Sequence, residues 1–224
     1  MYVPASFAEP NREVLQHFIV ANPLGALVTS SPTNGLYATH LPLLLDVHRG
    51  PHGVLQGHIA RANPHFRMAA DTTHAMVIFT GPQAYITPEW YASKARDGKV
   101  VPTWNYVAVH ATGTLKFIDD ADFLLSHLAR LTDANEAPRA HPWAMTDAPA
   151  EYVTQLTGAI VGIEIEIRAL EGKWKMSQNR PDDDIDGVIN GLRVSTQTTD
   201  HTVADLVSAR RPVRTKPDAK KNSH

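Results

Sequence analysis

The chain has 224 residues, of which 43% are hydrophobic and 20% are charged, as in an ordinary globular protein of one or two domains. Its 21 basic and 23 acidic residues leave a net charge of −2, so the molecule as a whole gives no sign of a polyanionic partner. The sequence has no cysteine, which excludes disulfides, thiolate metal sites and cysteine nucleophiles and fits a reducing compartment. With neither a signal-peptide pattern nor the ~18 consecutive apolar residues of a membrane span, it predicts a soluble, cytoplasmic protein with no membrane partner.

The first 90 residues are predicted to form short strands joined by tight turns. Asn11 is suited to cap a helix that ends near Pro23. Strands are expected at residues 24–30, 36–47, 54–59, 74–79 and 83–87. A turn at 32–35, with the residues Pro-Thr-Asn-Gly, joins the first two strands into a hairpin. A short helix is expected from Asn63 to Ala70.

The second half contains the clearest helix, which begins at Asp119 and Asp120 because acidic side chains favour the positive end of a helix. Further helices are expected at residues 149–156 and 181–190, and strands at 107–118, 160–170 and, after a turn at Glu171-Gly172, 173–178. The end of the chain is basic through Arg210, Arg211, Arg214, Lys216, Lys220 and Lys221. We therefore predict one domain over 1–193 with helical additions, followed by a basic, flexible tail over 194–224.

Many short strands at regular spacing, with few helices between them, favour a mainly β (α+β) fold: an antiparallel barrel with peripheral helices. The strands do not alternate with long helices, and neither GxGxxG nor GxxxxGK[ST] occurs. A Rossmann fold and a P-loop are therefore not expected.

A first polar cluster lies in GHIARANPHF, residues 57–66, where Arg61 and Asn63 precede a short helix. A guanidinium beside the free N–H groups of a helix start can bind phosphate. The alternative is that Arg61 forms a surface salt bridge and Asn63 only caps the helix.

Two further clusters are KMSQNR at 175–180 and VPTWNY at 101–106. The first could bind a phosphate or the edge of a heterocycle, or it could be an exposed strand end. In the second, alternation along a strand places Trp104 and Tyr106 on one face and Thr103 and Asn105 on the other. One pair could face a ligand while the other packs in a core or a dimer interface.

The twelve histidines do not form a metal motif: HExxH and HxH are absent, and Gly50 and Pro51 separate His48 from His52. We therefore expect no metal site. No serine nucleophile motif is present either, and no catalytic residue is assigned.

These clusters occur together with MYVPASF at the start, THLPLLL at 39–45 and GPQAYITPEWY at 81–91. The combination resembles the PaiB-type family of FMN-binding negative transcriptional regulators over residues 1 to about 193. The resemblance implies an FMN-binding split β-barrel that forms a homodimer, with FMN as the cofactor. The cofactor-binding residues that it implies are Thr39, His40, Leu41, Pro42, His58, Arg61, Asn63, Thr103, Trp104, Asn105, Lys175, Ser177 and Gln178.

Two functions remain open. The first is a flavin-binding transcriptional regulator, although the folded portion has neither a helix-turn-helix pattern nor a strongly basic face, so operator DNA is a weakly supported partner. The second is an FMN-dependent oxidoreductase or flavin reductase acting on a small molecule, in which His40, His58 or His110 could deliver protons. Whether the chain is an enzyme stays open, and a haem-binding split barrel is a third alternative.

Overall fold

The computed structural model describes residues 1–31, 35–68 and 72–213, which form two compact units. The first unit takes residues 1–3, 8–81 and 108–173, and the second takes 4–7, 82–107 and the chain from 174 onward. The strands are β1 Ala8–Glu9, β2 Leu24–Ser31, β3 Gly35–Pro42, β4 Leu44–Asp46, β5 Val54–Ala60, β6 Thr72–Ile86, β7 Thr103–Ile118 and β8 Ile160–Lys175. The helices are α1 Arg12–Ala21, α2 Pro64–Met68, α3 Ser93–Arg96, α4 Ala121–Glu136, α5 Ala150–Gly158, α6 Asp182–Arg193 and α7 Thr198–Ala209, with 3-10 turns η1 Ala5–Phe7, η2 Pro88–Trp90 and η3 Met145–Asp147.

The strands form one sheet in the order β3-β2-β6-β7-β8-β5-β4, with β1 paired to β8. The β2–β3 hairpin is antiparallel and runs from the pair Leu24↔Pro42 to the pair Ser31↔Gly35. The pairs β2–β6, β4–β5, β5–β8 and β1–β8 are antiparallel as well. The fold is therefore mainly β with added helices, which confirms the predicted class. The turn expected within 32–35 lies largely outside the described residues.

The core of the first unit is built from alternate strand residues. On β8, Ile163, Ile165 and Ile167 are fully buried, as the period of two along a strand requires. Leu27 of β2 and Leu55 of β5 are also fully buried. Each of these large side chains contributes about 1.5–3 kcal/mol through burial.

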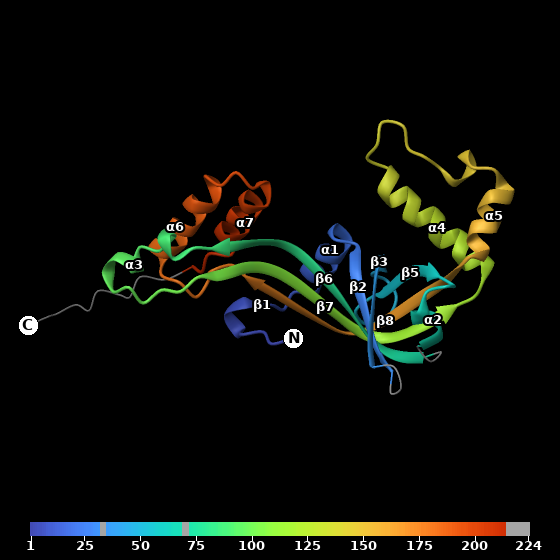
Figure 1. The fold of residues 1–224 in the computed structure, drawn as a ribbon, viewed down its shortest axis with the longest axis horizontal. Coiled ribbons are helices and arrows are strands. Elements are labelled where there is room, and N and C mark those ends of the chain that lie inside the picture. The colour runs from blue at the N-terminus through green and yellow to red at the C-terminus, as the bar shows by residue number, and fades with distance from the viewer. Residues whose placement is uncertain (32–34, 69–71, 214–224) are drawn as a thin grey trace, which may run out of the picture. The chain divides into compact units, whose positions relative to one another are not determined.

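Side-chain caps start two helices of the first unit where the sequence predicted them. The Asn11 side-chain oxygen accepts the backbone N–H of Glu13 at 2.9 Å, and that of Asp120 accepts the N–H of Phe123 at 2.7 Å. The helix that Asp120 caps, α4, lies beside α5 (Figure 1). Within the described ranges, no helix is long and apolar enough to cross a membrane.

The second unit is centred on the paired helices α6 and α7 (Figure 1). The two helices bury apolar residues: Ile185, Val188 and Leu192 from α6, and Val203 and Val207 from α7. The spacing of three and four residues in each helix places these side chains on a single face.

Two glycines on α6 allow η2 to approach the helix closely. A Cβ on Gly187 would lie 1.8 Å from the carbonyl oxygen of Trp90, and a Cβ on Gly191 would lie 2.2 Å from the Trp90 indole. No side chain fits at either position, so the glycines are required by packing rather than by backbone conformation.

The predicted turn at Glu171-Gly172 is wrong, because β8 continues through it to Lys175. Gly172 pairs with Glu9 of β1, and Lys173 pairs with Ala8. The ladder pairing with β1 outweighs the local turn preference of a Glu-Gly pair. In the same way, β6 runs unbroken through Gly81-Pro82.

The predicted flexible tail over 194–224 is wrong in its first part. Residues 198–209 form α7, whose Val203 and Val207 are fully buried, and the Arg210 guanidinium lies 4.9 Å from the centre of the Trp174 ring. Burial of this apolar face stabilises the helix, which contains no Lys or Arg, because the basic residues of the predicted tail begin only at Arg210. The predicted boundary at 193 therefore falls within the second unit, and residues 214–224, with four of the six cations, lie outside the description.

Candidate functional site

A buried imidazole organises the corner between β3 and α2 in the first unit. His65 is fully buried. Its Nδ1 lies 2.9 Å from the Thr39 Oγ1 of β3, and its Nε2 lies 2.9 Å from the Thr29 Oγ1 of β2. Asn63 joins the network, because its side-chain nitrogen donates to Thr39 Oγ1 at 3.3 Å. The strand that carries THLP and the segment that carries ARAN are therefore brought together.

The protonation of His65 follows from its surroundings. Burial lowers the pKa of His65, so the ring is neutral at pH 7. Each ring nitrogen lies against one threonine hydroxyl, so in the neutral ring one nitrogen donates to its threonine and the other accepts a hydroxyl proton. Both nitrogens of the ring are therefore satisfied, and the contact holds the Thr39 side chain in place.

Arg61 lies in the same segment and is engaged in a salt bridge. Its two terminal nitrogens donate to the Asp119 carboxylate, and its Nε donates to the Gly158 carbonyl at 2.9 Å. The pairing raises the pKa of Arg61 and lowers that of Asp119. A phosphate at this guanidinium would have to replace Asp119 or share the guanidinium with it. The role of Arg61 in phosphate binding stays a prediction.

The rest of THLP lies on an exposed strand. β3 is the last strand in the sheet order, so alternate N–H and C=O groups on its outer edge are left unpaired by the sheet of the described residues. Leu41 is buried, whereas His40 and Pro42 are exposed. The strand therefore offers backbone donors and acceptors beside an exposed imidazole.

His58 of β5 forms a pair with a histidine that the sequence analysis did not select. Its Nδ1 lies 3.2 Å from Nε2 of His127 on α4, which is fully buried and stacks on Phe123 with ring centres 6.1 Å apart. Burial, reinforced by the neighbouring charges of His58 and Arg130, lowers the pKa of His127 to about 4. Burial also lowers the pKa of His58.

The remaining predicted residues belong to the second unit and gather where β7 begins and β8 ends. Lys175 Nζ donates to Thr103 Oγ1 and to the Trp104 carbonyl, both at 2.6 Å. Asn105, fully buried, donates to Ser177 Oγ at 3.0 Å. The two sequence clusters are thus joined by hydrogen bonds, as their residue types suggested.

Ser177 has the unusual backbone conformation of this group. Its φ is +62°, the left-handed region that costs a non-glycine residue about 1 kcal/mol or more. Gln178 stabilises the bend: its side-chain oxygen accepts the Met176 N–H at 2.7 Å, and its nitrogen donates to the Trp174 carbonyl at 2.6 Å. Such strain is often found at functional sites.

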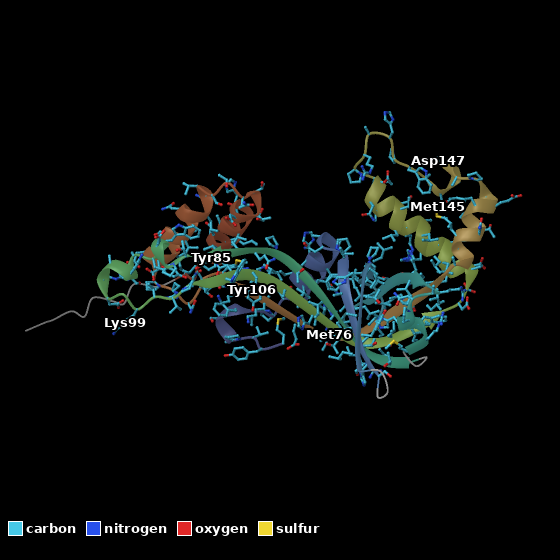
Figure 2. The ribbon with its side chains drawn as sticks, viewed as in Figure 1. Met76, Tyr85, Lys99, Tyr106, Met145 and Asp147 are labelled. Atoms are coloured by element: carbon cyan, nitrogen blue, oxygen red, sulfur yellow. The ribbon has the colours of Figure 1, made fainter. Side chains whose placement is uncertain are left out.

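An exposed aromatic pair lies beside this cluster. Trp104 and Tyr85 are 53% and 48% exposed, and their rings meet edge-to-face with centres 5.8 Å apart. Figure 2 shows Tyr85 on β6 and Tyr106 on β7, two strands that neighbour each other in the sheet. Because Trp104 is exposed and Asn105 is fully buried, Trp104 lies on the solvent side of β7 and Asn105 on its buried side.

Sequence reasoning missed two buried histidines, His65 and His127. Each had a signal: His65 lies within the selected ARANPHF motif, and His127 falls four residues after Phe123 on the apolar face of α4. His110, a proton-delivery candidate, has a partly buried ring whose pKa is lowered by burial. In the described part of the chain, no three His, Cys, Asp or Glu residues are grouped to hold a metal.

An antiparallel sheet of this topology with peripheral helices defines the split-barrel class. The FAD and haem binding protein of Mycobacterium smegmatis has the same fold, with a TM-score of 0.57 at 18% identity over 80% of this chain and 78% of that one. Residues 1–169 match the family described as "Putative FMN-binding domain".

Two relatives agree with this match. Protein AN0679 of Emericella nidulans is 35% identical over 96% of this chain and 100% of its own length. The protease synthase and sporulation protein PAI 2 of Bacillus subtilis is 31% identical over 92% of this chain and 96% of its own length. The chain belongs to this PaiB-type FMN-binding family, which confirms the predicted resemblance, fold class and cofactor.

Proposed function

We propose that this protein is an FMN-dependent redox protein that acts on a small molecule, and that the corner of β3 and α2 contacts the flavin. The observation that carries the proposal is the network of Thr39, Asn63 and His65 beneath an edge strand of an FMN-binding family member. Bound FMN supplies one- and two-electron chemistry, while the protein supplies binding and orientation.

The residues of this corner suit a flavin. Its isoalloxazine edge alternates hydrogen-bond donors and acceptors, and the outer edge of β3 offers complementary backbone groups. Thr39 is held by His65, so a contact from this strand would need little rearrangement. The second-unit residues Thr103, Trp104, Asn105, Lys175, Ser177 and Gln178 remain predicted flavin contacts.

Thr39 and Thr29 make a matched pair for the test, because both hydroxyls bond the same imidazole but only Thr39 lies on the proposed strand. FMN fluorescence quenching would give the Kd of each variant. We expect Thr39→Val to weaken FMN binding about tenfold, about 1.4 kcal/mol, and Thr29→Val to stay within about threefold of wild type. Equal losses in the two variants would show that only the His65 network matters and would refute a flavin contact by Thr39.

Redox turnover is tested separately by NADH and NADPH oxidation with an electron acceptor present. We expect a rate above that of free FMN at the same concentration. A rate equal to that of free FMN would remove the enzymatic proposal and leave the flavin-binding role intact.

A regulatory role is the second candidate, since the printed name of the Bacillus subtilis relative includes sporulation. Charge argues against direct DNA contact by the described residues. Helix α6 starts with Asp182, Asp183 and Asp184, and the exposed Arg211 pairs with Asp186 at 2.6 Å. We therefore expect that the protein does not shift promoter DNA in a gel at moderate salt. A shift that persists at moderate salt would instead favour a regulator that binds DNA directly.

The predicted homodimer and cytoplasmic location belong to the same proposal. The exposed Trp104–Tyr85 pair would suit an interface, because aromatic side chains are enriched there. Sedimentation equilibrium would distinguish a species of twice the 24.6 kDa chain mass from the monomer.

A further inference from the structure

A second candidate binding site lies in the first unit, apart from the β3–α2 corner. It is a cavity of about 450 Å³ walled by α4, α5, the connection between them, and the adjoining ends of β5 and β8. Figure 2 shows Met145, one of the lining residues, in that connection next to both helices. The volume falls in the range of small-molecule sites, about 300–1,000 Å³.

The lining is apolar and carries no ionised group. Among the described residues, no Asp, Glu, Lys or Arg side chain contributes to it. Three of its large side chains, Trp143, Tyr152 and Leu156, are 45%, 54% and 50% exposed. Apolar surface gathered in a concave site favours an apolar ligand, and an uncharged lining disfavours a charged one such as FMN phosphate.

One histidine supplies a directional polar group. His58 lines the cavity, and its Nδ1 is bonded to His127. His127 Nδ1 is buried without a partner, and an unpaired lone pair is easier to bury than an unpaired N–H. His127 therefore holds its proton on Nε2 and donates it to His58 Nδ1, so that His58 carries its own proton on Nε2 as a hydrogen-bond donor.

The wall opposite the sheet is fixed by hydrogen bonds. The Glu136 carboxylate at the end of α4 accepts the Trp143 backbone N–H at 3.1 Å and the Arg139 Nε at 3.0 Å. The Asp147 carboxylate accepts the Ala144 N–H at 2.9 Å. These contacts order the connection that carries Trp143 and Met145, so the cavity is formed before a ligand arrives.

We propose that this cavity binds an uncharged, flat apolar molecule with a carbonyl or similar acceptor, which receives a hydrogen bond from His58 Nε2–H. The volume is that of a small-molecule site, and the neutral lining suits neither an ion nor a phosphate ester. The family resemblance implied a flavin contact by His58, and this proposal assigns His58 to the cavity instead. It does not rest on FMN binding at the β3–α2 corner.

Nile red is a suitable probe, because it is neutral, planar and apolar, has a ring carbonyl, and fluoresces strongly in apolar surroundings. Ala148 lines the cavity, whereas Ala140 is exposed in the same connection and does not. Ala148→Phe should fill the cavity, and Ala140→Phe adds the same ring outside it. We expect saturable one-to-one binding by wild type and Ala140→Phe, and at least a tenfold loss in Ala148→Phe.

His58→Phe tests the hydrogen bond and should weaken binding about threefold to tenfold, the usual effect of one lost hydrogen bond. Excess FMN should leave Nile red binding unchanged. Equal affinity in Ala148→Phe and Ala140→Phe would overturn the proposal, because the dye would then bind elsewhere. Competition by FMN would also overturn it, by assigning the cavity to the flavin.

Discussion

Acidification should destabilise this protein through His127. The pKa of His127 is lowered from 6.5 to about 4 in the folded state, because the buried ring resists protonation. Between these values the unfolded chain binds more protons, so stability is fully present above pH 6.5 and is lost as pH falls toward 4. The difference corresponds to about 3 kcal/mol at low pH and to about 2 kcal/mol between pH 7 and pH 5. A loss of that size is large for a typical domain stability of about 5–15 kcal/mol.

Urea unfolding at pH 7 and at pH 5 measures this loss. The informative quantity is the change in the free energy of unfolding of each protein between the two pH values. His127→Phe should lose about 2 kcal/mol less than wild type over this interval, whatever its stability at pH 7. His17 lies exposed on α1, so His17→Phe is the matched control and should behave as wild type. His58 and His65, whose pKa values are also lowered, add to the acid loss in all three proteins. Identical pH dependence in wild type and His127→Phe would refute the argument.

Two further predictions concern the second unit and its helix α6, with a control from the first unit. Gly187→Ala should cost about 1–3 kcal/mol of unfolding free energy, because the new Cβ would lie 1.8 Å from the Trp90 carbonyl oxygen. Gly158→Ala in α5, with no atom within 4 Å of its Cβ, should instead be neutral or stabilising by up to about 1 kcal/mol, and equal effects of the two substitutions would contradict the packing argument. Asp184→Ala should cost about 1–3 kcal/mol, because the fully buried carboxylate accepts both the backbone N–H at 2.8 Å and the hydroxyl at 2.6 Å of Ser93. Thermal unfolding measures the stability cost of Asp184→Ala. An unchanged melting temperature would contradict the prediction and show that water takes over the two hydrogen bonds from Ser93.

The strands and helices with strong local signals were predictable from sequence. Asn11 and Asp120 cap their helices because a short polar side chain can reach the free N–H groups of the first turn. The alternation of Ile163, Ile165 and Ile167 predicted a strand with one buried face. These features depend on neighbours within a few residues, which the sequence displays directly.

The candidate site was predictable in its residue types but not in its partners. Thr39 and Asn63 were selected, but their common neighbour His65 was not. Its only signal was its place within the ARANPHF motif, because a helix of five residues is too short for a periodicity that indicates burial. The sequence alone left two roles open for Arg61, phosphate binding and a surface salt bridge. Its engagement with Asp119, 58 residues away, is decided by how α4 approaches the strand end.

The sequence by itself determined the class of fold, the family and its cofactor, because short-range patterning and motifs carry them. Only the tertiary structure decided that Gly172 continues a strand, that residues 198–209 form a packed helix, and that His58 meets His127. In each case the deciding contacts come from residues distant in the chain, and the free energy of burial and of ladder hydrogen bonds exceeds the local preference. The cavity beside His58 has the same origin, since its walls come from two helices and two strand ends.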